Sequence, residues 1–187
     1  AEYFNESGGN GRAFVLVTAG PGLTNLVTAL ACAFLESREL LVLGGQVKST
    51  DLATNGLRQR GIQEVDGVAI AAPVSKIAVR VEQPVDRATF EGWVSQAASG
   101  RPGPVFIEMC LDAQAHPVEI SLATPTTTSR RGAPQVVSDA DLCKVRDAIA
   151  RSKRPLVLLG GGVHRKEMPD ILARLERSGI PVMTTWN

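Results

Sequence analysis

A glycine-containing turn between an apolar run and a helical pattern is the feature that most constrains the fold of this chain. The apolar run Ala13-Phe-Val-Leu-Val17 predicts a strand, and Thr18-Ala-Gly-Pro-Gly-Leu-Thr-Asn25 follows it directly. Apolar residues then recur at helical spacing, at Leu23, Leu26, Val27, Leu30, Ala31 and Phe34. A strand, a tight turn and a helix in this order are typical of open α/β sheets, whose ligands bind at the carboxyl ends of the strands.

The residues of the turn favour close approach of a ligand to the backbone. Gly20 and Gly22 carry no side chain that would keep a ligand away, and Pro21 presets φ for the first helical turn. The third glycine of a dinucleotide fingerprint is missing, because Asn25 stands in its place, and no Gly-Lys-Ser/Thr follows as in a P-loop. From the turn alone, a ligand-binding loop and an ordinary strand-to-helix connection both stay open.

Strand-like and helix-like segments alternate through the rest of the chain. The expected strands are 13–17, 40–43, 76–81, 105–109, 155–159 and 180–185. The expected helices follow the turn to about residue 35 and cover 84–99, 139–152 and 169–178. This alternation predicts the α/β class, with a mostly parallel sheet covered by helices on both faces.

Composition divides the chain into two domains. Residues 124–134, within the stretch 116–138, contain almost no apolar side chains and predict a linker. We therefore expect one domain over 1–115 and a second α/β domain that begins in 139–187. The second segment holds too few strands to bury both faces of a sheet, so we expect the chain to be a piece of a larger protein.

Charge and cysteine content exclude several classes of function. The formal net charge is +1, which gives no electrostatic reason to expect a nucleic-acid partner. No apolar run is long enough to span a membrane, and the first residues do not have the pattern of a signal peptide. Cys32, Cys110 and Cys143 are scattered without a CxxC pair, so we expect no metal site or disulfide framework, and a cytoplasmic location.

Several segments together resemble the thiamine-diphosphate-dependent enzymes of the acetolactate synthase type. They follow the order and spacing of that family and cover essentially the whole chain. The matching segments are 16–25 (LVTAGPGLTN), 44–47 (GGQV), 61–64 (GIQE), 72–76 (APVSK), 99–105 (SGRPGPV) and 154–163 (RPLVLLGGGV). The family is built from a pyrimidine-binding domain, a central domain and a diphosphate-binding domain.

The resemblance implies a division of the cofactor site between this chain and the rest of the parent protein. Residues 1–115 match the later two-thirds of the pyrimidine-binding domain, and residues from 139 onward match the start of the central domain. The glutamate that activates thiamine diphosphate is then expected upstream. The Gly-Asp-Gly…Asn segment that holds Mg²⁺ is expected in the third domain, and no Gly-Asp-Gly occurs in this sequence. A homodimer or tetramer of the parent is expected by the same resemblance.

The resemblance also implies site residues. Gln63 matches a position that faces the substrate and is the catalytic candidate, because a neutral amide can donate to a carbonyl or carboxylate. Gln46 matches a glutamine near the cofactor, and ordinary hydrogen bonding within a loop is the alternative for both glutamines. The residues that match the loop against the aminopyrimidine ring are Thr18, Gly20, Pro21, Gly22 and Asn25.

A second nucleotide site is implied in the central domain. Gly160, Gly161 and Gly162 resemble the loop that approaches FAD in acetolactate synthases, and Thr184 and Thr185 resemble a second FAD contact. Many relatives leave this site empty or bind another group there, so FAD and its absence both stay open.

The implied reaction is the decarboxylation of pyruvate and the transfer of its two-carbon unit to an acceptor carbonyl. The segment 46–64 is similar to a subgroup that uses a keto-sugar acceptor, and Ile62 stands where acetolactate synthases usually have an aromatic residue. A second pyruvate, another 2-ketoacid and a keto-sugar therefore stay open as acceptors. The alternatives are a benzaldehyde-lyase-like or oxalyl-CoA-decarboxylase-like enzyme of the same fold, or a non-catalytic fragment.

Overall fold

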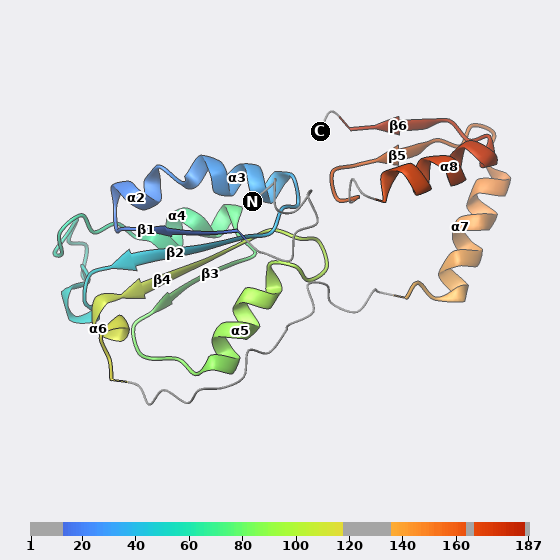
Figure 1. Cartoon of the computed structure of the whole chain (residues 1–187). Coiled ribbons are helices and arrows are strands. Elements are labelled where there is room, and N and C mark those ends of the chain that lie inside the picture. Colours follow the sequence, from blue (N-terminus) through green and yellow to red (C-terminus); the bar gives the residue numbers. More distant parts are fainter. Residues whose placement is uncertain (1–12, 118–135, 164–166, 186–187) are drawn as a thin grey trace. The chain divides into compact units, whose positions relative to one another are not determined.

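A computed structural model describes residues 13–117, 136–163 and 167–185 of the 187-residue chain (Figure 1). The chain divides into two compact units, Ala1–Arg130 and Arg131–Asn187. The boundary between the units falls within the predicted linker 116–138, most of which lies outside the described residues.

The first unit is built on a parallel four-stranded sheet. Its strands are β1 (Phe14–Val17), β2 (Leu40–Gln46), β3 (Ile77–Val81) and β4 (Pro104–Cys110), in the order β1-β2-β4-β3. The four strands predicted for this part of the chain are confirmed. Because all strands run in one direction, their carboxyl ends lie along one edge of the sheet, where ligands bind in α/β proteins.

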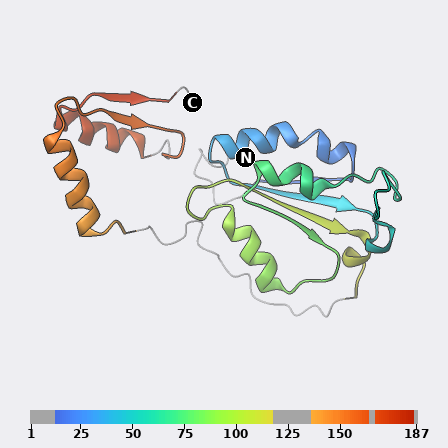
Figure 2. The same ribbon diagram turned by 180° about the vertical axis from the view of Figure 1, so that it is seen from behind.

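Helices cover both faces of this sheet, as the alternating pattern predicted. Figures 1 and 2 show α2 (Pro21–Thr24), α3 (Val27–Leu35) and α4 (Gly67–Ala71) on one face and α5 (Arg87–Gln96) on the other. The shorter elements are η1 (Ser49–Asp51), η2 (Ala72–Val74) and α6 (Leu111–Gln114). Asp66 and Asp86 cap α4 and α5 by accepting hydrogen bonds from the N–H groups of Ala69 and Thr89.

Two of the predicted helix boundaries are corrected. The helix expected from the turn to about Leu35 is divided into α2 and α3, because Leu26 N bonds to Leu23 O three residues back and interrupts the helical ladder. The helix expected over 84–99 begins only after Asp86, whose side chain satisfies the first turn of α5.

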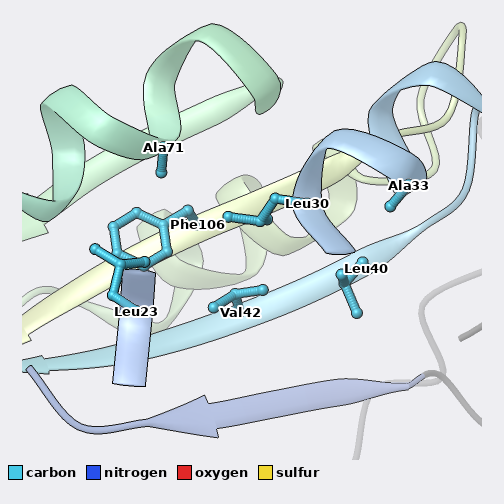
Figure 3. Close-up of a cluster of buried hydrophobic side chains, with 7 residues drawn as sticks. All are labelled: Leu23, Leu30, Ala33, Leu40, Val42, Ala71 and Phe106. Atoms are coloured by element: carbon cyan, nitrogen blue, oxygen red, sulfur yellow. The ribbon is translucent and has the colours of Figure 1, made fainter. Parts of the chain in front are cut away.

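The hydrophobic core lies on both sides of the two central strands. Figure 3 shows Phe106 and Val42 packed with Leu23 and Leu30 beneath α2, α3 and α4. The side chains on either side of Phe106 point to the other face, where Val105 and Ile107 pack with residues of α5 and its surroundings, namely Val81, Ala97, Phe90 and Trp93. Burial on both faces explains why β2 and β4 are nearly continuous apolar runs.

The edge strand β1 is less well covered. Val15 and Val17 pack against the core under α3, but Phe14 and Leu16 on the other face are 64% and 72% exposed. A hollow that is almost entirely apolar lies beside Phe14, lined also by Leu40, Leu41 and Val94. It lies at the amino ends of β1 and β2, which is the end of the sheet opposite the glycine turn.

The second unit contains α7 (Asp139–Arg151), β5 (Val157–Leu159), α8 (Met168–Ser178) and β6 (Val182–Thr184). Its four predicted elements are confirmed, and β5 pairs with β6 in parallel. Ser138 caps α7, and Gly179 ends α8 in the left-handed conformation with φ of 67°. Across the described parts of both units, every helix is too short or too polar to cross a membrane.

Candidate functional site

The turn after β1 lies at the carboxyl edge of the first sheet. Gly20 has φ 62° and ψ −114°, a conformation that glycine adopts far more readily than other residues. Pro21 occupies the start of α2, as its fixed φ predicted. The candidate cofactor contacts Thr18, Pro21 and Asn25 are exposed along this turn.

The structure brings Gln63 against this turn. A Cβ atom built on Gly20 would lie 2.3 Å from the carbonyl oxygen of Gln63 and 3.0 Å from its Cβ. The chain's own loop therefore fills the space that a side chain at Gly20 would take. Approach of a ligand to the Gly20 backbone stays a prediction. Gly22 serves packing as well, since a Cβ there would lie 3.0 Å from Cγ2 of Thr18.

Glu64 organises the loop that carries Gln63. Its carboxylate accepts hydrogen bonds from the N–H groups of Ala53, Arg60 and Gly61 at 2.5, 2.8 and 2.9 Å. Partial burial raises the pKa of Glu64, but these backbone donors outweigh it and hold the pKa below its usual value. One carboxylate thus ties together the loop from Ala53 to Glu64.

Gln63 and the turn present uncommitted polar groups to solvent. The side chains of Thr18, Asn25 and Gln63 are exposed, and within the described ranges none of them makes a hydrogen bond. Gln63 has a left-handed backbone with φ of 56°, which is uncommon for a residue with a side chain. Ile62 beside it is 86% exposed. This group of neutral donors, acceptors and one apolar side chain can receive a polar ligand.

Gln46 is engaged inside the fold. It is 5% exposed, its Nε2 donates to the carbonyl of Val65 at 2.9 Å and to Oε1 of Glu108 at 3.1 Å, and its Oε1 accepts from Val47 N. Both amide hydrogens are therefore used within the chain. The structure shows for Gln46 the internal hydrogen bonding that was the alternative to a cofactor contact.

Gln46 belongs to a polar network that sequence reasoning missed, made of Gln46, Asp66, Arg80 and Glu108. Oε2 of Glu108 accepts from Nε of Arg80 at 2.6 Å, and Nη2 of Arg80 lies 3.0 Å from Oδ1 of Asp66. Glu108 is 2% exposed, and burial raises its pKa above the usual value against the opposing effects of Arg80 and Gln46. Arg80 and Glu108 interrupt the apolar runs of β3 and β4, and these two charges within apolar strands were the sequence signal that could have indicated the network.

The predicted residues of the second unit also come together. Leu159 pairs with Thr184 in the sheet, and the N–H of Thr185 donates to the carbonyl of Leu159 at 2.9 Å. Gly160 follows β5 directly, and a Cβ on it would lie 3.9 Å from Cγ2 of Thr185. Gly160, Gly161, Gly162, Thr184 and Thr185 thus share the carboxyl end of one strand pair.

The described residues contain no group of three or more His, Cys, Asp and Glu side chains arranged to hold a metal ion. Cys110 ends β4 in the core, where burial raises the pKa of its thiol to about 11. A thiol with that pKa is protonated at neutral pH and is a poor nucleophile.

Comparison with known proteins relates this chain to one enzyme family. Residues 1–70 match the family described as thiamine pyrophosphate enzyme, N-terminal TPP binding domain. The chain is 35% identical over 182 residues to a probable acetolactate synthase large subunit of Methanocaldococcus jannaschii, covering 94% of this chain and 30% of that relative. It is 33% identical over 174 residues to the acetolactate synthase large subunit of Lactococcus lactis, covering 91% and 29%.

A eukaryotic relative gives a similar result. The chain is 33% identical over 185 residues to the mitochondrial acetolactate synthase catalytic subunit of Saccharomyces cerevisiae, covering 91% of this chain and 26% of that relative. The chain therefore spans less than a third of the length of these relatives.

Proposed function

Because this chain belongs to the thiamine pyrophosphate enzyme family, we propose that it supplies the carboxyl-edge site of an enzyme that decarboxylates pyruvate and transfers the two-carbon unit to an acceptor carbonyl. The observation that carries this proposal is the contact between the Gly20 turn and Gln63 at the carboxyl edge of a parallel sheet. It places uncommitted polar groups where an α/β fold binds its ligand.

The residues at this edge fit thiamine diphosphate as the cofactor. When bound, this cofactor supplies the carbon nucleophile and accepts the electrons released on decarboxylation. Thr18, Pro21 and Asn25 would border its aminopyrimidine ring, because they are exposed on the turn and the first and last carry unpaired polar groups. Gly20 and Gly22 would act by keeping the turn in place. The activating glutamate and the Mg²⁺ site would be supplied by other parts of the protein.

Gln63 would bind and orient the 2-ketoacid. Its amide can donate to a ketone or carboxylate oxygen, and it stays neutral at every physiological pH. Its left-handed backbone and its contact with Gly20 fix where the side chain leaves the loop. Holding a reactant in one orientation is a large part of what a protein adds to cofactor chemistry.

Ile62 favours a second candidate for the acceptor. The relatives named above are acetolactate synthases, which favours a second 2-ketoacid. However, Ile62 is exposed beside Gln63, and it is smaller than an aromatic side chain would be at that position. The freed volume favours a bulkier acceptor such as a keto-sugar.

FAD would bind at Gly160–Gly162 with Thr184 and Thr185, since these residues meet at the carboxyl end of β5 and β6.

The parent protein would be a cytoplasmic homodimer or tetramer.

The test uses the full gene product that contains this chain, supplied with thiamine diphosphate, Mg²⁺ and pyruvate. We expect release of carbon dioxide, and we expect Gln63→Ala to lower kcat/KM for pyruvate about 10-fold or more, as loss of a donor to a reacting oxygen does. Gln96→Ala is the matched control, because Gln96 ends α5 as an exposed residue and its side chain accepts a hydrogen bond from the hydroxyl of Ser99. The proposal is refuted if the cofactor-loaded protein releases no carbon dioxide from pyruvate. Product analysis with pyruvate alone and with added keto-sugars decides the acceptor.

A further inference from the structure

Gln63 lies between two anchors in the sequence. On one side of its peptide unit, the Glu64 carboxylate closes the loop by accepting the N–H groups of Arg60 and Gly61. On the other side, Val65 and Asp66 are tied to the sheet by the polar network. The position of Gln63 therefore depends on groups that do not themselves face the site.

The hydrogen bonds that connect Val65 and Asp66 to the sheet both lead to Glu108. One carboxylate oxygen accepts from Nε2 of Gln46, which also donates to the carbonyl of Val65. The other oxygen accepts from Nε of Arg80, whose Nη2 donates to Oδ1 of Asp66. Glu108 thus orients the amide that holds Val65 and the guanidinium that holds Asp66, and its own side chain is almost fully buried.

The packing around this arrangement leaves little freedom for Gln63 to move independently. Its carbonyl oxygen lies so close to Gly20 that a methyl group would not fit between them. Gly67, the residue after Asp66, is packed equally closely, because a Cβ on it would lie 2.1 Å from Oε1 of Glu108. A shift of Val65 and Asp66 is therefore passed to Gln63 and to the turn.

We infer that Glu108 is a positioning residue for Gln63, acting through Gln46 and Arg80 and without contact to the substrate. The inference rests on the proposed function for the role of Gln63. It also reassigns Gln46 from a cofactor contact to a link in the network.

The substitution Glu108→Gln isolates this role. It keeps the volume of the side chain but replaces one acceptor oxygen with a donor. Gln46 Nε2 and Arg80 Nε are both donors, so whichever way the new amide turns, one of the two bonds is lost. The matched control is Glu91→Gln on α5, because Glu91 makes a surface ion pair with Arg87.

The first experiment is a double-mutant cycle in the full gene product, with kcat/KM for pyruvate as the readout. We expect Glu108→Gln to lower kcat/KM about 10-fold when Gln63 is present, but less than about 2-fold in the Gln63→Ala background. Glu91→Gln should change neither value. Equal losses in both backgrounds would show that Glu108 does not act through Gln63, and would overturn the inference.

The second experiment does not depend on activity. Amide hydrogen exchange is measured over residues 61–70 and over α5 in the wild type, in Glu108→Gln and in the milder Asp66→Asn, which keeps a good helix cap. Faster exchange confined to residues 61–70 in both variants supports the inference. Unchanged exchange there, or a uniform increase that includes α5, overturns it. If the wild type fails to use pyruvate, the proposed function fails and this exchange result alone decides whether Glu108 holds the loop.

Discussion

Substitution of Gly67 by alanine tests the packing around Glu108 most directly. Gly67 is the first residue of α4, and a Cβ on it would lie 2.1 Å from Oε1 of Glu108 and 2.6 Å from Cδ2 of Leu23. Neither neighbour can withdraw to solvent, because both are 2% exposed and Glu108 is held by Gln46 and Arg80. Overpacking of this kind costs about 1–3 kcal/mol.

The intrinsic preference of a helix for alanine acts in the opposite direction. Alanine is favoured over glycine by about 0.5–1 kcal/mol at such positions, so we expect Gly67→Ala to lower the free energy of unfolding by about 1–2 kcal/mol. Gly92→Ala in α5 is the matched control, since nothing lies within 4 Å of a Cβ there. It should raise the stability by about 0.4–1 kcal/mol.

Urea denaturation followed by far-UV circular dichroism measures both variants against the wild type. The reasoning predicts midpoint shifts of opposite sign for one and the same substitution in two helices. A Gly67→Ala protein as stable as the wild type would refute the close contact between α4 and Glu108. A shift of the same sign and size in both variants would show that helix propensity alone decides the outcome.

Two further predictions concern the loop and its turn. Gly20→Ala would place a Cβ at a positive φ and only 2.3 Å from the carbonyl oxygen of Gln63. We expect it to lower the free energy of unfolding, measured by urea denaturation, by about 2–4 kcal/mol, and an unchanged value would refute the contact. Partial burial raises the pKa of Glu64, but the backbone donors outweigh it and keep the pKa below its ordinary value of 4.5. The ionised carboxylate therefore stabilises the loop fully above that pH, and this stabilisation is lost as the pH falls through the lower pKa of the folded state. Amide exchange of Arg60, corrected for its intrinsic pH dependence, should accelerate on acidification in the wild type, whereas Glu64→Gln should exchange fast throughout; identical profiles would contradict the role of the carboxylate.

Much of the fold could be predicted from local patterns. The apolar runs predicted every strand of both sheets, and the helix expected from residue 139 begins at Asp139. The glycine turn with Pro21 predicted the start of α2. The break between α2 and α3 was not predictable in this way, because the apolar spacing continues across Asn25 and Leu26 without a change.

The candidate site was predicted only in part. The resemblance pointed to the turn and to Gln63 as separate segments, and the structure shows that they touch. Ligand binding by these residues stays a prediction. Gln46 was matched to the cofactor, whereas its amide is consumed by Val65 and Glu108.

The sequence by itself determined the class of the fold, the strands and longer helices along the chain, and the family, since periodicity, turn residues and short motifs involve only neighbouring residues. The tertiary structure alone decided what fills the space above Gly20 and which partner Glu108 finds. Arg80 and Glu108 read as isolated charges within apolar strands until the parallel register places them opposite each other. Such a pairing depends on how distant strands align, and no local pattern carries that information.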